Sequence, residues 1–258
     1  MTGSIVLNER AYAENALENL SLGQKPVETI NRIAKYYYSL GYKKPQIAKL
    51  IEEFLVKCDP NINIVKWQGV IDSIVKSSDK YKLIEIPGIP ITKAEIDAIL
   101  AIDQKHYKNS QLQRLMFTML CLAKYSNAVN PANNNWVNRQ DKDIFSLANI
   151  VVTSKRQSLM INDLWNLGYI GYSRVVDNVN LNVKIVNDQS EQILFIDDFR
   201  NLGYQYLMHY GDEGRYKFCE CCGKAIKVNS GRQKYCSECA ADMNRQKAIE
   251  RYHRLIAI

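Results

Sequence analysis

The chain has 258 residues, 47% of them hydrophobic and 24% charged, with a formal net charge of +7. This composition excludes an intrinsically disordered chain, and the length allows two or three small domains. No apolar run approaches the about 18 residues of a membrane-spanning helix, and no secretory signal opens the chain, so we expect a cytoplasmic protein with no membrane partner. Seven cysteines without an even framework also favour a reducing compartment.

Residues 1–110 are predicted to form a small helical domain. Apolar side chains recur at helical spacing in three segments: residues 26–40, 45–55 and 64–75. Proline and glycine punctuate residues 81–90, which predicts an extended stretch. Thr92 and Glu95 have the spacing of a capping box and predict a fourth helix to about Ile102.

Residues 111–214 are predicted to form a winged helix-turn-helix. An apolar helix, a short helix, a turn, a longer helix and a hairpin give this order. The expected helices cover residues 111–125, 142–148 and 154–167. The expected hairpin strands cover residues 169–176 and 181–186, and a further strand over residues 193–196 is expected beside them. The core face of the longer helix would be formed by Leu159, Met160, Leu164 and Leu167.

Two helix starts are also predicted in this region. Ser154 and Gln157 have the spacing of a capping box, so the longer helix is expected to begin there. Asp197 or Asp198 is expected to cap a helix over residues 199–210, because helix N-termini favour carboxylates.

The longer helix is the expected DNA reader, since this helix enters the major groove by its N-terminal end. That end carries side chains of the types that contact phosphates and base edges: Ser154, Lys155, Arg156 and Gln157. Arg174 and Lys184 would lie on the wing. Residues 111–214 carry 9 Lys/Arg and 10 Asp/Glu, a net charge of −1, so docking on a protein stays open as an alternative.

The chain ends with two Cys-x-x-Cys knuckles separated by 13 residues: Cys219/Cys222 and Cys236/Cys239. Four thiolates at this spacing are typical of a structural Zn²⁺ site with no open position. Gly223 would supply the positive φ that the first knuckle needs. The alternatives are disulfides, which the lack of a secretion context disfavours, and reduced cysteines with no metal. Cys221 could replace a neighbour as ligand, but Cys219 gives the regular two-residue gap.

Most of the positive charge lies on the same segment. Residues 215–258 carry 10 Lys/Arg and 4 Asp/Glu, a net charge of +6, whereas residues 1–110 carry 15 and 13. A basic segment of this density attracts a polyanion, and each phosphate that it neutralises releases counterions. A helix is predicted from residue 240 to residue 256. The side chains expected to contact phosphates are Arg232, Lys234, Arg245, Lys247, Arg251 and Arg254.

Four stretches resemble phage and prophage proteins of Gram-positive bacteria that end in a zinc ribbon. They are residues 113–125 (QRLMFTMLCLAKY), 152–158 (VTSKRQS), 198–206 (DFRNLGYQY) and 232–240 (RQKYCSECA). The resemblance implies a mobile-element origin and a bacterial host cell more than a biochemical activity. The ending RQKYC is also similar to that of diverse phage proteins, some of them homing-endonuclease-like.

The sequence therefore predicts a mainly α protein with small β elements (α+β): a helical domain over 1–110, a winged helix over 111–214, and a zinc ribbon with a basic helix over 215–258. We expect a non-enzymatic protein that binds double-stranded DNA in transcription control or replication. One alternative is an adaptor that docks on a host polymerase or replication protein. Another is a nuclease, which would need a carboxylate cluster for Mg²⁺. The oligomeric state stays open.

Overall fold

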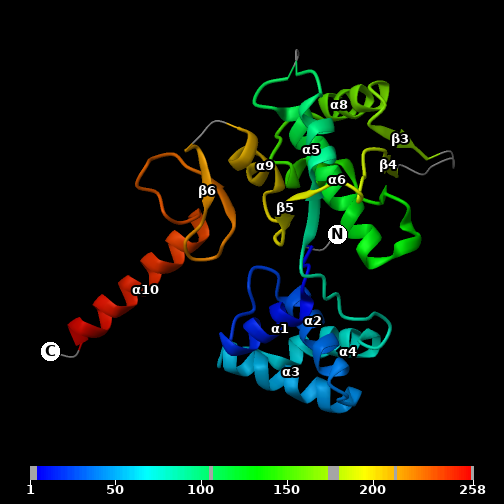
Figure 1. The fold of residues 1–258 in the computed structure, drawn as a ribbon. Coiled ribbons are helices and arrows are strands. Elements are labelled where there is room, and N and C mark those ends of the chain that lie inside the picture. Colours follow the sequence, from blue (N-terminus) through cyan, green and yellow to red (C-terminus); the bar gives the residue numbers. More distant parts are fainter. Residues whose placement is uncertain (1–4, 105–106, 174–179, 212–213, 257–258) are drawn as a thin grey trace. The chain divides into compact units, whose positions relative to one another are not determined.

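A computed structural model describes residues 5–104, 107–173, 180–211 and 214–256 (Figure 1). The described residues form helices and small antiparallel sheets, which confirms the α+β class at this coarse level. Contacts divide the chain into two compact units, Met1–Gly88 and Ile89–Ile258. This division differs from the three domains expected, whose boundaries were placed at residues 110 and 214.

The first unit (blue to cyan in Figure 1) is a four-helix domain. Its helices are α1 (Glu9–Glu18), α2 (Pro26–Ser39), α3 (Lys44–Cys58) and α4 (Ile64–Ser77). Large apolar side chains at helical spacing fill its core: Ile30, Ile33, Ile47, Ile51, Leu55 and Ile71. The three helices predicted from this spacing are confirmed. Helix α1 was not predicted, because its apolar buried residues are only Ala13 and Ala16, which give a weak periodic signal.

The second unit holds the remaining elements. Its helices are α5 (Lys93–Leu100), α6 (Gln111–Val129), η1 (Pro131–Asn133), α7 (Asp141–Leu147), α8 (Ser154–Asn166), α9 (Leu202–Tyr210) and α10 (Ser237–Ile256). Its strands are β1 (Ile89–Thr92), β2 (Trp136–Val137), β3 (Ile170–Tyr172), β4 (Leu181–Val183), β5 (Gln192–Ile196), β6 (Tyr216–Phe218) and β7 (Ala225–Lys227). Helix α6 is buried over most of its length and is the centre of this unit (Figure 1). Nowhere in the described ranges is a helix both long and apolar enough to span a membrane.

The boundary between the units lies at Gly88 because the strand that follows it pairs with a strand of the second unit. Strand β1 pairs antiparallel with β5, with Ile89 opposite Ile196. The predicted capping box is confirmed, since Thr92 N donates to Glu95 Oε2 over 2.8 Å. Glu95 is also ion-paired with the buried Lys124 of α6 at 2.9 Å. The placement of the strand over 193–196 beside the hairpin was wrong, because its partner is β1.

The helices and strands from α6 to β4 follow a fixed order. The chain runs α6, η1, β2, α7, α8, β3, β4, and the three strands form one antiparallel sheet in the order β2-β4-β3. Trp136 in β2 and Ile170 in β3 both face β4, opposite Asn182 and Val183 respectively. A six-residue connection, 148–153, separates α7 from α8.

Two predicted helix caps were wrong. Thr153, not Ser154, caps α8, and its hydroxyl accepts from Arg156 N. Helix α9 begins at Leu202, after Asn201 with a φ of 58°. Asp198 instead accepts a 2.7 Å bond from Arg200 N, which forms a turn ahead of the helix.

Candidate metal centre and nucleic-acid surface

Four cysteine sulfurs lie together at the end of the second unit. The Sγ atoms of the cysteine cluster all lie within 4.8 Å of one another: Cys219, Cys222, Cys236 and Cys239. In the part of the chain that the structure describes, no other group of three or more His, Cys, Asp or Glu side chains is so arranged. Cys221 is exposed and lies outside the cluster. The cysteine cluster can therefore hold a metal ion with the four ligands that the spacing predicted.

The separations of the sulfurs fit a tetrahedral ion. A Zn–S bond of about 2.3 Å in a tetrahedron places two sulfurs about 3.8 Å apart. Cys222 Sγ lies 3.9 Å from Cys236 Sγ. This pair, one sulfur from each knuckle, is therefore already at the separation that a tetrathiolate site requires.

Local backbone geometry makes the two knuckles. Cys219 follows β6, and Gly223 adopts a φ of 71°, the left-handed conformation predicted for it. Gly223 N donates to Cys219 O over 3.0 Å and closes the first turn. Cys236 N donates to Cys219 Sγ over 3.3 Å, and Cys239 N donates to Cys236 Sγ over 3.4 Å. The second knuckle also lies at the start of α10, where the helix dipole favours thiolates.

The thiols differ in acidity. Burial raises the pKa of Cys219, but backbone N–H groups of both knuckles outweigh it and lower this pKa to about 6. Burial raises the pKa of Cys222, and burial with the neighbouring cysteines raises that of Cys239. Since the thiolate is the ligating form, a cation among the four sulfurs would offset the repulsion that keeps these thiols protonated.

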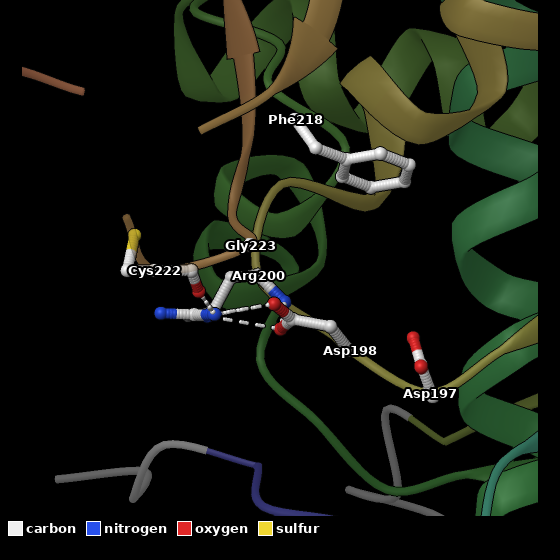
Figure 2. A pocket seen from close by; sticks show the side chains of 6 residues that line it. All are labelled: Asp197, Asp198, Arg200, Phe218, Cys222 and Gly223. Atoms are coloured by element: carbon white, nitrogen blue, oxygen red, sulfur yellow. Dashed lines mark hydrogen bonds and ion pairs between the residues drawn. The ribbon is translucent and has the colours of Figure 1, made fainter. Parts of the chain in front are cut away.

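The first knuckle is fastened to the turn between β5 and α9. Arg200 Nη2 donates to the backbone oxygen of Cys222 over 2.6 Å. The same guanidinium is ion-paired with Asp198 at 2.7 Å, and Figure 2 shows it between the carboxylate and the knuckle. These residues line a pocket of about 440 Å³ with Asp197, whose carboxylate lies apart from the ion pair (Figure 2). Neither aspartate therefore caps α9, and sequence patterns did not reveal Arg200.

A second connection joins the ribbon, defined as residues 215–236, to the turn between α7 and α8. Asn201 Nδ2 donates to Ala225 O in β7 over 2.7 Å. Asn201 Oδ1 accepts from Asn149 Nδ2 over 3.0 Å, and Asn149 lies two residues after the end of α7. Asn149 Oδ1 in turn accepts from Tyr204 N over 3.1 Å. The ribbon thus packs on the rest of the second unit through side-chain amides as well as through the rings of Tyr204 and Tyr216.

The predicted groove-reading residues lie together at the start of α8. Ser154 and Lys155 are exposed, and Gln157 is half-buried. The Arg156 guanidinium lies 4.6 Å from the centroid of the Tyr107 ring. The Tyr107 hydroxyl donates to Asp163, and burial together with this bond raises the pKa of Tyr107 to about 12. Arg156 is therefore held by an aromatic surface rather than extended freely.

The outward face of α8 is more apolar than predicted. Leu159 and Leu167, expected in the core, are 46% and 49% exposed. Trp165 is 47% exposed, and its ring centroid lies 5.7 Å from that of Tyr172 in β3. Met160 and Leu164 form the buried face as expected.

On the hairpin, Lys184 follows β4 and lies over Gly171. A Cβ atom on Gly171 would lie 3.1 Å from Lys184 Cε, so the lysine stem covers the glycine closely. Lys184 N donates to Tyr169 O over 2.9 Å and extends the hairpin. The predicted wing residue Arg174 lies outside the described residues.

The predicted phosphate contacts fall into two groups. Arg232, Lys247 and Arg251 are exposed and have no acidic partner among the side chains that the structure describes. Lys234 lies 3.5 Å from Glu220, and Arg245 lies 3.0 Å from Asp242. Such exposed pairs contribute at most about 1 kcal/mol, so both cations remain available to a polyanion. The side chain of Arg254 lies outside the described residues.

The structure thus groups the cysteine cluster at one site and the polar N-terminal residues of α8 at another. Three residues that sequence patterns missed connect the first site to the rest of the unit: Arg200, Asn149 and Asn201. Comparison of the chain with models of known families, with curated proteins and with solved structures finds no match.

Proposed function

We propose that this protein binds double-stranded DNA, with no enzymatic activity of its own, through a winged helix formed by α6 to β4 and through a zinc-stabilised basic segment. The observation that carries the proposal is the strand order β2-β4-β3. A strand placed between the first two helices and paired with the last hairpin strand is the arrangement that winged helices use to present the helix-turn-helix.

In this proposal α8 is the helix that enters the major groove. Its N-terminal end offers two hydroxyl or amide side chains and two cations: Ser154, Gln157, Lys155 and Arg156. Arginine can donate two bonds to the edge of a guanine, and packing on Tyr107 leaves less conformational freedom to lose on binding. Arg156 is therefore the residue proposed to read a base.

Zn²⁺ is the ion proposed for the cysteine cluster. Four soft thiolate ligands in a tetrahedral arrangement favour zinc over the hard cations, which prefer oxygen. With all four positions occupied by protein, the ion would supply folding stability to the ribbon and no reactive position. The cluster would thereby hold the start of α10, with its cations, on the second unit.

Phosphate contacts are proposed for three exposed cations of the ribbon and α10 that have no acidic partner among the described side chains: Arg232, Lys247 and Arg251. The charge of residues 215–258 is +6, against −1 for residues 111–214. Sequence-independent affinity would therefore come mainly from the ribbon and α10, and sequence preference from α8.

A salt series tests the proposal. Binding of random double-stranded DNA by the full chain should weaken linearly on a double-logarithmic plot, with a slope near −0.9 for each phosphate neutralised. The triple variant R232Q/K247Q/R251Q should lose up to about 2.7 from that slope. K49Q/K57Q/K66Q, which removes three exposed lysines of the first unit, is the matched control and should keep the slope. Absence of binding at low salt would reject the proposal.

The exposed apolar face of α8 favours a second candidate, an adaptor that docks on a host polymerase or replication protein. Leu159 and Trp165 are both nearly half exposed, and aromatic anchors of this kind are typical of protein interfaces. A tagged full chain would then retain a host protein after nuclease treatment, and W165A would release it. Retention that disappears with nuclease would instead favour DNA.

A further inference from the structure

The metal-binding knuckle and the turn before the proposed groove-reading helix are joined through hydrogen bonds of two consecutive residues in the β5–α9 turn, Arg200 and Asn201. Arg200 bonds the carbonyl of Cys222 within the first knuckle, at 2.6 Å. Asn201 bonds the carbonyl of Ala225, three residues further along, at 2.7 Å. Two consecutive side chains therefore hold the two ends of the segment 222–225, which begins at the ligand Cys222.

The bonds of Asn201 continue into the connection between α7 and α8. Asn201 and Asn149 share a 3.0 Å bond between their side-chain amides. The remaining oxygen of Asn149 accepts from Tyr204 N at the start of α9, and its backbone oxygen accepts from Arg114 Nη1 at 3.1 Å. Arg114 lies on α6 and is buried. Asn149 is thus the point where α6, α9 and the turn before α8 meet.

Asparagine suits both positions for two physical reasons. Asn149 and Asn201 adopt left-handed φ values of 54° and 58°, which asparagine tolerates better than most residues. Each side-chain amide also donates with its nitrogen and accepts with its oxygen, so it can transmit one bond into the next. At Asn201 a carboxylate would face the Ala225 carbonyl without a proton to donate.

The backbone at the start of α9 also packs closely on the turn between α7 and α8. A Cβ atom on Gly203 would lie 1.8 Å from the carbonyl oxygen of Ala148. The first turn of α9 therefore rests directly on the residue that precedes Asn149. Interiors packed this tightly pass displacement on rather than absorbing it.

We propose that Asn201 and Asn149 form a positioning relay, which fixes the turn between α7 and α8 to the first knuckle, so that metal binding orders the start of α8. The role of α8 in the groove and the zinc ion both rest on the proposed function, but the coupling of the metal to the turn does not require DNA binding. Two distinct sites, the cysteine cluster and the N-terminal end of α8, are then linked through one element. Loss of the metal would loosen both the ribbon and the turn.

Hydrogen–deuterium exchange of the full chain, with zinc and after chelation, tests the relay. In the native protein, zinc should slow exchange several-fold at Tyr204 N and over residues 148–153. Asn201→Gly removes the amide but permits the left-handed φ, so it should abolish this zinc dependence while the protein stays folded and binds one zinc ion. Asn134→Gly is the matched control, since Asn134 has a φ of 51°, lies in the same unit and is exposed. It should keep the zinc dependence.

Three results would overturn the relay. One is exchange over 148–153 that does not respond to zinc in the native protein. Another is a zinc response that survives in Asn201→Gly, and the third is its loss in Asn134→Gly as well. None of these readouts needs DNA, so the failure of DNA binding would reject the proposed function and leave the coupling to be judged on exchange alone.

A DNA arm then tests the part that rests on the proposed function. Zinc-loaded Asn201→Gly should keep the salt slope of the native protein, because the phosphate contacts are unchanged, but should discriminate less between a selected site and random DNA. A purely structural role would lower both together. Unchanged discrimination would mean that the relay does not affect how α8 recognises DNA.

Discussion

The Arg156 guanidinium lies over the Tyr107 ring, 4.6 Å from its centroid, although the two residues belong to different segments of the second unit. Tyr107 is itself fixed by its hydroxyl bond to Asp163 of α8. The first turn of α8 therefore presents a pre-oriented cation rather than a mobile one. Pre-orientation lowers the entropy lost on binding and sharpens selectivity for one hydrogen-bonding geometry.

Arg156→Ala should relax sequence preference. Loss of one bidentate base contact costs about 1–3 kcal/mol of discrimination, with little change on random DNA. Competition between a selected site and a scrambled site measures this difference. Lys142→Ala removes an exposed cation of α7 and is the control, which should leave preference unchanged. If Arg156→Ala also leaves the sequence preference unchanged, α8 does not read the groove.

Each chain should bind one zinc ion through the cysteine cluster. Cys236→Ser should abolish stoichiometric binding, because the site needs four thiolates, and should unfold the ribbon. Cys221→Ser should retain the metal, since Cys221 is exposed and outside the cluster. Metal analysis after gel filtration distinguishes them. Loss of metal in Cys221→Ser would mean that the ligand set is different.

Metal affinity should fall as the pH is lowered. The pKa values of metal-free Cys222 and Cys239 are raised above the ordinary 9.0, so both thiols carry protons at neutral pH and must release them on binding. Each proton released weakens the apparent affinity about tenfold per pH unit. Cys219, with a pKa of about 6, adds to the decline only below that pH. Competition with a chromophoric chelator measures the trend, and a flat profile would contradict it.

Two Gly→Ala substitutions should have opposite effects on stability. A Cβ on Gly203 would collide with the Ala148 carbonyl at 1.8 Å, so Gly203→Ala should cost at least about 1–3 kcal/mol. Gly69 lies within α4 with nothing within 4 Å of such a Cβ. Gly69→Ala should therefore gain about 0.5–1 kcal/mol. Urea unfolding followed by circular dichroism measures both, and a tolerated Gly203→Ala would disprove the close approach.

Local sequence patterns predicted the features that depend only on residues close together in the chain. The periodic helices α2, α3 and α4 and the capping box of Thr92 agree with prediction, because one apolar face or one short motif specifies each. Cysteine spacing identified the cluster for the same reason. These features need no knowledge of distant partners.

Long-range contacts were the source of the errors in strand pairing and in the buried face of α8. Strand β1 pairs with a segment about a hundred residues later, which no local pattern indicates, so the boundary moved to Gly88. Leu159 and Leu167 have helical spacing yet face outward, because neighbouring elements decide which side of α8 is covered. The asparagine relay was missed because isolated asparagines in turns carry no periodic signal.

The most direct test of the account is a map of where DNA protects the full chain. Hydrogen–deuterium exchange of the zinc-loaded protein would be compared with and without double-stranded DNA. We expect slower exchange at the start of α8, over residues 153–158, and in the ribbon and α10, with the first unit unchanged. Protection confined to the first unit, or none at saturating DNA, would contradict the account.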